Sequence, residues 1–218
     1  MKLSGWAAVG WMVGGIAWVV TGFAGLGATD GTAAFYRAET AWVVVHLLIL
    51  FGLVGLVRSG AVGELAWGTK GFGVTIVGRI IFLLGELAAL VVGHDDLFLF
   101  PVAAVLTGVG MIVGGLAVVR AGRWEGPLRY APLAMGIYPF VAMFPVLAVT
   151  GERPDALMSC WGLMMLAVGL AMIRATADPA LLAGSMTERG QEGGELVDRV
   201  APVPNRRQGV VPTDVGIS

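Results

Sequence analysis

Three strongly polar side chains stand inside long apolar stretches of this sequence, and they are the residues best suited to chemistry. His46 lies in one stretch, Arg79 and Glu86 lie in the next, and Glu39 stands at the start of the first. Ionisable groups at such positions are costly, and they usually face a bundle interior or a water-filled cavity. An imidazole, with an ordinary pKa of about 6.5, exchanges protons near neutrality. The four residues therefore predict a site that handles a proton or an anionic solute.

The spacing of these residues places them on two helix faces. Glu39 and His46 are seven residues apart, as are Arg79 and Glu86, so each pair shares one face two turns apart. At a rise of about 1.5 Å per residue, His46 falls between Arg79 and Glu86 in depth. A short connection joins the two stretches and favours adjacent antiparallel helices. We expect Arg79, His46 and Glu86 to cluster near the middle of the membrane, with Glu39 toward its outer mouth.

Other residues at similar depth are candidates for a cavity wall or a gate. Thr107, Ser159 and Tyr138 could complete a polar cavity around the cluster. Pro139 and Pro145 stand six residues apart in the fifth apolar stretch. Proline removes a backbone donor and clashes with the preceding turn, which predicts a kinked or locally opened helix. The alternative is that neighbouring helices simply accommodate both prolines.

The sequence contains no pattern typical of a cofactor site or a catalytic centre. Bis-histidine haem ligation is not expected, because His94 stands at an outer boundary, far from His46. His94, Asp95 and Asp96 are interpreted as a solvated turn rather than a cation site. The single cysteine, Cys160, excludes a disulfide framework and a multi-thiolate metal site. We therefore assign no catalytic residue, no metal ligand and no cofactor.

The composition explains why helices in a membrane must position these residues. Of 218 residues, 57% are hydrophobic and 13% charged, whereas about a quarter are charged in soluble chains. Apolar stretches of about 18 or more residues are typical of spanning helices. Six stretches qualify: Gly5–Gly25, Glu39–Val57, Gly71–Gly93, Leu97–Val119, Ala131–Val149 and Asp155–Ile173. The predicted fold is an all-α, polytopic integral membrane protein with six transmembrane helices.

A net charge of −1 gives no reason to expect nucleic acid as a partner.

The basic residues orient the six predicted spans. If the N-terminus is cytoplasmic, the inner segments carry most of them: Lys2, Arg58, Lys70, Arg120, Arg123, Arg129 and Arg174. The outer segments carry only Arg37 and Arg153 and are acidic. This asymmetry predicts that both termini are cytoplasmic. Arg120, Arg123 and Arg129 also suit anionic lipid head groups, although orienting the chain explains them equally well. Trp42 lies near the outer boundary, where an aromatic belt would account for it.

The chain divides into residues 1–175, the transmembrane domain, and residues 176–218, a segment of different composition. The second part is rich in Gly, Pro and charged residues and has no sustained apolar period. Such a segment buries too little surface to offset its ordering entropy, which predicts a disordered cytoplasmic tail. Asp178 followed by Pro179 is typical of a helix start, so a short helix is expected over Pro179–Ala183.

Two glycine steps predict close helix packing. Gly10 and Gly14, like Gly110 and Gly114, form small-xxx-small steps that let two backbones approach. They could pack within one chain, or against a second copy or another membrane protein. The segments Val9–Ala17 and Val109–Ala117 resemble each other, which leaves an inverted repeat open.

These features favour a small proton-linked secondary carrier that uses Arg79, Glu86 and His46. The alternative is a non-catalytic accessory or assembly subunit whose buried charges pair with the helices of a partner. A membrane-embedded enzyme ranks third. Twelve arginines against two lysines, with abundant Ala, Gly and Val, favour a bacterial plasma membrane as the location.

Overall fold

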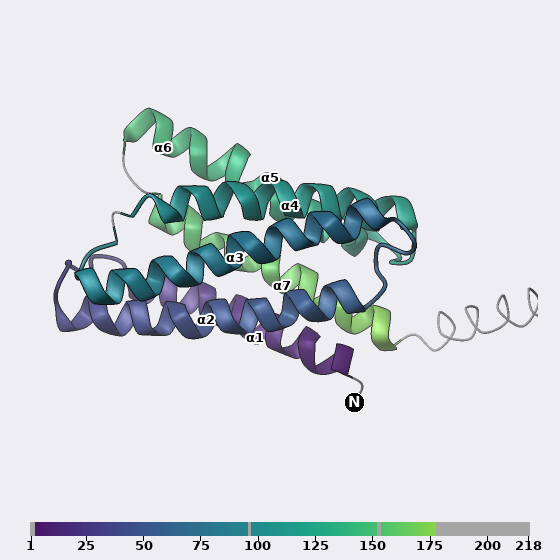
Figure 1. Cartoon of the computed structure of the whole chain (residues 1–218), viewed down its shortest axis with the longest axis horizontal. Coiled ribbons are helices and arrows are strands. Elements are labelled where there is room, and N and C mark those ends of the chain that lie inside the picture. The colour runs from purple at the N-terminus through teal and green to yellow at the C-terminus, as the bar shows by residue number, and fades with distance from the viewer. Residues whose placement is uncertain (1–2, 96, 152–153, 178–218) are drawn as a thin grey trace, which may run out of the picture. The chain divides into compact units, whose positions relative to one another are not determined.

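The computed structural model describes residues 3–95, 97–151 and 154–177, and the regular elements in these ranges are helices (Figure 1). In chain order they are α1 (Leu3–Ala24), α2 (Ala33–Arg58), α3 (Ala66–Val92), α4 (Leu99–Ala121), η1 (Pro127–Tyr130), α5 (Ala131–Tyr138), η2 (Pro139–Met143), α6 (Phe144–Thr150) and α7 (Asp155–Ala177). The predicted tail and the short helix expected at Pro179–Ala183 lie outside the described residues.

Among the described residues, six helical stretches are long and apolar enough to cross a membrane, and they confirm the all-helical, six-span prediction at that level. They are α1, α2, α3, α4, the combined stretch from η1 to α6, and α7. Large apolar side chains such as Val20, Leu84 and Val109 stand exposed along their outer faces. Such an outer surface is suited to lipid rather than to water.

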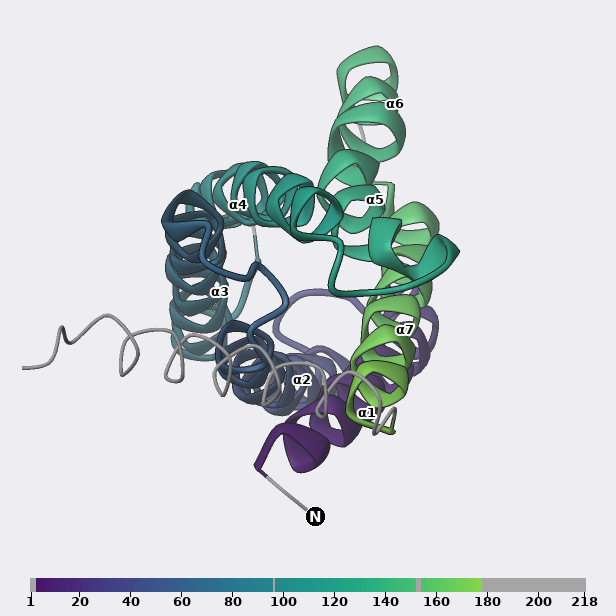
Figure 2. The same ribbon diagram turned by 90° about the vertical axis from the view of Figure 1, so that its right-hand side faces the viewer.

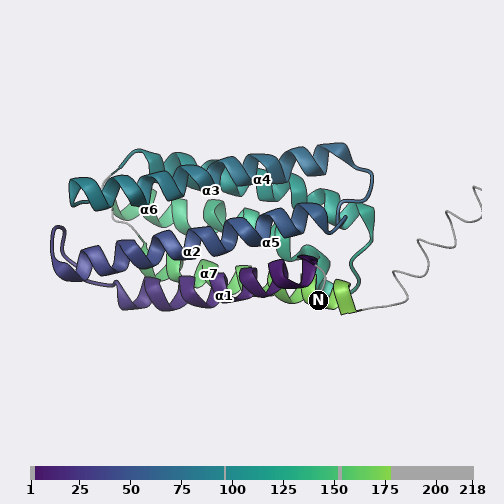
Figure 3. The same cartoon turned by 60° about the horizontal axis from the view of Figure 1, so that its bottom comes forward.

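The helices form a closed ring in chain order. Each contacts the next, from α1 through α5, and α7 contacts both α5 and α1 (Figure 2). The long helices run nearly parallel or antiparallel to one another (Figure 3). The connections α1–α2, α3–α4 and α6–α7 lie at one end of the ring, here called the acidic end. The connections α2–α3 and α4–η1 lie at the opposite, basic end (Figure 1).

The most extensive contact among these helices is the seam between α3 and α4, which is lined by small residues. On α3 they are Gly68, Gly71, Thr75 and Gly78, and on α4 they are Ala103, Thr107, Gly110, Gly114 and Ala117. A Cβ added to Gly71 would stand 2.6 Å from the backbone nitrogen of Gly114. A Cβ added to Gly110 would stand 2.5 Å from the nitrogen of Thr75. Glycine is therefore required here for the backbones to approach so closely.

Both predicted glycine steps pack within the chain. Gly10 and Gly14 lie against Phe51 and Ile49 of α2, while Gly110 and Gly114 lie in the α3–α4 seam. The sequence left open whether these glycines pack within one chain or against another chain, and in the structure they pack within the chain.

Helix α2 begins six residues before the apolar stretch that predicted it. The Thr32 side chain caps its start by accepting a hydrogen bond from the Phe35 N–H, at 3.3 Å. An apolar stretch marks the part of a helix that suits lipid, whereas capping decides where the helix starts. Glu39 therefore stands in the second turn of α2, where it is buried, rather than at the helix end.

The fifth span is broken, as its prolines predicted. Helix α5 ends at Tyr138, the π-helical turn η2 begins at Pro139, and α6 begins at Phe144. Because Pro139 lacks an N–H, it cannot donate to the carbonyl of Met135 in the regular helical pattern. The chain changes direction at this point, and α6 projects away from the ring (Figure 2).

Candidate functional site

A cavity of about 540 Å³ reaches from the acidic end into the ring. Its lining runs from Asp30 and Asp95 in the end connections down to His46 and Trp161 between the helices. Side chains of α1, α2, α3, α4, η2, α6 and α7 contribute to the wall. The volume is that of a typical small-molecule site, for which about 300–1,000 Å³ is usual.

His46 is held on the wall by contacts from three sides. Its ring stacks on Phe82, with centroids 5.1 Å apart, and meets the Trp18 ring edge-on at 5.4 Å. Its Nε2 lies 3.3 Å from Oε1 of Glu86. The side chain is 1% exposed, and its Nδ1 has no hydrogen-bond partner among the described residues. The imidazole is thus fixed in orientation, with one nitrogen toward a carboxyl group.

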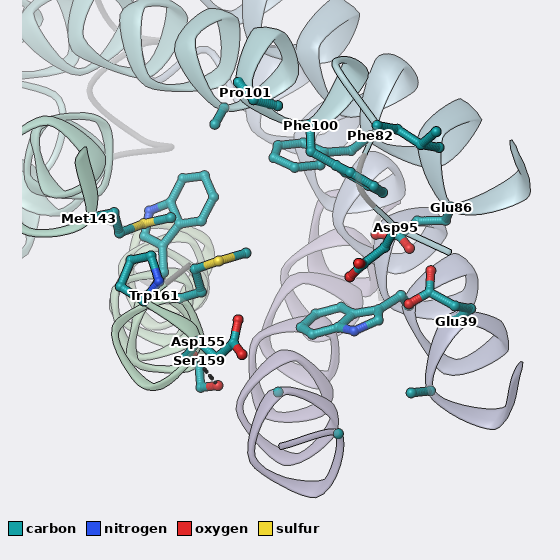
Figure 4. Close-up of a pocket in the computed structure, with 18 of the residues that line it drawn as sticks. Glu39, Phe82, Glu86, Asp95, Phe100, Pro101, Met143, Asp155, Ser159 and Trp161 are labelled. Carbon is teal, nitrogen blue, oxygen red and sulfur yellow. Dashed lines mark hydrogen bonds between the residues drawn. The ribbon is translucent and has the colours of Figure 1, made fainter. Parts of the chain in front are cut away.

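Acidic residues gather on the same part of the wall. Glu39 and Glu86 are 5% and 6% exposed, and both line the cavity. Figure 4 shows them with Asp95 on one side of the cavity, while Asp155 and Ser159 lie on the other. Together with Asp30, five residues with carboxyl groups line the cavity within the described part of the chain. The wall can therefore hold protons or cations.

Arg79 is fully buried in a cage of aromatic rings. Its guanidinium carbon lies 4.7 Å from the ring centre of Trp161, 5.0 Å from that of Trp18 and 5.4 Å from that of Phe82. All three rings also line the cavity. Within the described chain, none of the guanidinium nitrogens has a hydrogen-bond partner. Cation–π attraction to the rings is therefore its direct stabilisation.

The structure brings His46, Glu86 and Arg79 together, but only the first two are in direct contact. His46 and Glu86 are in direct contact, and Glu39 shares their cavity. Arg79 joins them through Trp18 and Phe82, which touch both its guanidinium and the His46 ring. Its positive charge therefore acts through an aromatic layer rather than through a salt bridge.

Of the residues expected to complete the cavity, Ser159 lines it and donates a hydrogen bond to the Asp155 carbonyl at 2.8 Å. The Tyr138 hydroxyl instead donates to the Leu157 carbonyl at 3.0 Å and ties α5 to α7. Thr107 lies in the α3–α4 seam, opposite Gly78. The prediction that Tyr138 and Thr107 face the cavity is therefore wrong, because depth alone does not give the direction of a side chain.

The break at Pro139 is compensated by a neighbouring helix. Trp161 Nε1 donates to the Met135 carbonyl at 2.9 Å, and this is the acceptor that residue 139 would bond in a regular helix. Pro145 stands in the first turn of α6, where a missing N–H is tolerated. The same Trp161 ring contacts Arg79, so the break and the aromatic cage share one side chain.

Three aromatic residues of the site were missed or placed elsewhere from the sequence. Trp42, expected in a belt at the membrane surface, lines the cavity with its ring centre 4.7 Å from that of Trp18. Trp18 and Trp161 were not singled out. Each lies six residues, or about 9 Å, inside the end of its helix. That depth, together with the spacing of seven between Trp11 and Trp18, was the available signal.

The acidic connections were also undervalued. The structure places Asp30, Asp95 and Asp155 on the cavity wall, a role that the sequence does not predict for them. Asp95 stands in a partly exposed connection, as expected for a solvated turn, and also lines the mouth of the cavity. Asp96 lies outside the described residues.

The three arginines expected at lipid head groups lie at the basic end. Arg120 lies 5.8 Å from the ring centre of Trp67, and Arg129 donates a hydrogen bond to the Tyr130 hydroxyl at 2.7 Å. The Arg123 guanidinium lies beside Gly60 and Gly63 of the α2–α3 connection. The Arg123 contact joins the two connections at this end, whereas Arg129 contacts only its chain neighbour. Binding of lipid by these arginines stays a prediction.

The chain matches no protein-family model, no curated protein and no solved structure. Residues 3–95, 97–151 and 154–177 contain no group of three or more His, Cys, Asp or Glu placed to hold a metal ion.

Proposed function

We propose that this chain is a secondary carrier in a membrane, and that it couples the movement of a small solute to that of protons. The cavity is the observation that carries this proposal. A buried His46–Glu86 contact lies on its wall, about 20 Å along α2 from the helix start at the acidic end. A carrier requires a solute site and a proton-exchanging group in the same space; the size of this cavity and the His46–Glu86 contact on its wall support that proposal.

The location of the polar groups favours a carrier over an accessory subunit. A subunit that pairs its charges with partner helices should present them on its outer surface. Here His46, Arg79 and Glu86 are all buried inside the ring, and the first and last line the cavity. The broken span α5–η2–α6 forms part of the cavity wall through Met143, Phe144 and Leu147. Because π-helical turns are frequent at functional sites, this span is the element that we propose moves.

The proposed topology has both termini and the basic end in the cytoplasm, and the acidic end with the cavity mouth outside. It follows from the charge of the two ends: Arg58, Lys70 and Arg120 lie at one, Asp30 and Asp95 at the other. A bacterial plasma membrane and a disordered cytoplasmic tail belong to the same proposal.

Reporter fusions after Gly31, Gly60, Asp96, Gly126, Gly151 and Gly184 test the topology. They should alternate between outside and inside, beginning outside. Two neighbouring fusions on the same side would contradict the six-span arrangement.

Proton coupling is tested on the full-length chain in liposomes that contain a pH-sensitive dye. A panel of an organic ammonium ion, an amino acid, a monocarboxylate and a sugar is added outside. At least one solute should drive proton movement in the wild type, and Glu86→Gln and His46→Ala should abolish it. Glu64→Gln, an exposed acid at the basic end, serves as the matched control and should retain it.

Arg79→Met tests whether Arg79 is needed for transport or for folding. If Arg79 serves the carrier, this variant should keep its fold, because a buried cation without hydrogen bonds carries a desolvation cost that methionine lacks. Transport should nevertheless be lost. Wild-type flux that depends on none of the three residues would reject the mechanism.

A double-mutant cycle tests whether His46 and Glu86 are energetically coupled. His46→Leu and Glu86→Leu should show a coupling energy of about 0.5–3 kcal/mol in thermal stability, as residues in contact do. Additive losses would show that the 3.3 Å contact does not matter energetically.

A further inference from the structure

We infer that the solute bound in the cavity is an amphiphilic organic cation, that is, an ammonium group carrying an aromatic or branched apolar part. This inference rests on the proposed carrier function and names its class of substrate. The sequence alone suggested a proton or an anionic solute. The distribution of charge and rings on the cavity wall favours a cation instead.

The charge on the wall is the first argument. Asp30, Glu39, Glu86, Asp95 and Asp155 line the cavity, and no lysine or arginine stands among its described lining residues. The nearest buried cation, Arg79, is separated from the cavity by the rings of Trp18, Phe82 and Trp161. An anion would therefore meet carboxyl groups and no basic side chain among the described lining residues, whereas a cation would be attracted by those carboxyl groups.

The aromatic rings are the second argument. Trp18, Trp42, Phe82, Phe100 and Trp161 all line the cavity. Aromatic faces attract cations, most strongly tryptophan, and clusters of them are a common means of binding quaternary ammonium groups. Three of these rings already surround the Arg79 guanidinium, which shows that this aromatic layer accommodates a cation at short range.

The division of the wall into two sides is the third argument, and it gives the shape of the ligand. The side formed by α2 and α3 carries His46, Glu39 and Glu86, and Asp95 follows α3. The side formed by α4, η2 and α6 is apolar throughout: Phe100, Pro101, Ala104, Met143, Phe144 and Leu147. Asp155 of α7 adds a carboxyl group across the cavity from Glu39 and Glu86. A ligand that fills the cavity therefore needs a charged part near these carboxyl groups and hydrocarbon toward α4, η2 and α6.

His46 provides an independent indication that the cavity holds a ligand. It is 1% exposed and lines the cavity, and its Nδ1 has no partner within the described residues. A polar atom buried in this way needs a hydrogen-bond partner, which a ligand with an N–H group can supply and a quaternary ammonium cannot. The quaternary compounds used below therefore test the charge and the apolar part of the ligand, not this hydrogen bond.

Binding to the purified full-length chain in nanodiscs tests the inference by calorimetry. Benzyltrimethylammonium carries both parts of the predicted ligand, tetramethylammonium carries only the charge, and benzenesulfonate reverses the charge. Benzyltrimethylammonium should bind saturably. Tetramethylammonium should bind at least about tenfold more weakly, since it lacks the apolar contacts. Benzenesulfonate should show no saturable binding.

Two variants separate the two sides of the wall. Glu39→Gln should weaken both cations about tenfold or more, by loss of a charged contact. Met143→Ala, on the apolar side and without an aromatic ring, should weaken benzyltrimethylammonium while leaving tetramethylammonium unchanged. Glu64→Gln, exposed at the basic end, is the matched control and should alter neither. Should Glu39→Gln fail to fold, Asp95→Asn in the α3–α4 connection replaces it.

The outcomes distinguish the inference from the function beneath it. Tighter binding of benzenesulfonate, or equal effects of Glu39→Gln and Glu64→Gln, would overturn the cation site. If another solute drives protons but benzyltrimethylammonium does not bind, the carrier stands and the substrate class is wrong. If benzyltrimethylammonium binds as described and no solute drives protons, the cation site stands and the coupling is wrong.

Discussion

The α3–α4 seam and the α5–η2–α6 segment differ in how regularly their helices are built and packed. The seam is a regular contact in which glycine brings two backbones together, as at Gly71 and Gly110. The segment is a broken helix whose outer part packs mainly against its own preceding turn. Both contribute to the cavity, since α3 carries Glu86 and α6 carries Leu147. The seam therefore holds its helices by close backbone contact, whereas the outer part of the segment, α6, is held by few contacts beyond its own preceding turn.

The largest expected effect comes from a single methyl group in the seam. Gly71→Ala should destabilise the protein by about 3 kcal/mol, because the new Cβ meets backbone that cannot turn aside. Its nearest atom would be the Gly114 nitrogen, at 2.6 Å. Thermal unfolding of the solubilised protein measures the change.

Gly73→Ala is the matched control on the same helix. A Cβ there meets nothing within 4 Å, and alanine favours a helix over glycine by about 1 kcal/mol. The control should therefore be neutral or stabilising. Equal effects of the two substitutions would contradict the close approach of α3 and α4.

Trp161→Phe should show how the ring compensates for the broken span. The variant loses the hydrogen bond to the Met135 carbonyl and leaves that buried acceptor unsatisfied, at a cost of about 1–3 kcal/mol. Thermal unfolding again provides the measurement. Trp6→Phe, at a side chain 57% exposed, should be nearly silent. A silent Trp161→Phe would mean that Pro139 needs no help from α7.

Pro139→Ala should change geometry more than stability. It restores an N–H that can bond Met135, so that η2 becomes regular helix and α6 rotates relative to α5. Spin labels at Cys160, the single cysteine of the sequence, and at Val149→Cys on α6 would report the distance between them. The distance distribution should shift, with a stability change of about 1 kcal/mol or less, because the Met135 carbonyl already accepts a hydrogen bond from Trp161.

Pro145→Ala is the companion variant. It alters a proline that lies after the π-helical turn, so it should leave the direction set at η2, and with it the label distance, unchanged. If it shifts the distance as far as Pro139→Ala does, the direction of α6 is not set at η2.

Removal of Glu188–Ser218 should have the smallest effect of all. This segment lies outside the described residues, and its composition offers no apolar face for packing on the ring. Membrane insertion and thermal stability should be almost unchanged. A large loss of stability would show that the tail contributes to the ring.

Local patterns in the sequence were sufficient for the spans and for part of the site. Runs of apolar residues located six helices, because a helix that suits lipid needs about 20 such residues regardless of its neighbours. The spacing of seven and the depth count placed His46 beside Glu86, because two antiparallel helices in contact bring equal depths together. Pro139 predicted the break in the fifth span, because the missing N–H is a property of proline itself.

Contacts between distant segments were decided only by the tertiary structure. That Trp161 meets both Arg79 and the Met135 carbonyl depends on how α7 rotates against α3 and α5. That Asp30, Asp95 and Asp155 share a cavity depends on three connections meeting at one end of the ring. A sequence gives each helix its period and its apolar length, but the rotation of each helix about its axis is set by packing against its neighbours. That rotation decided which buried residues share the cavity.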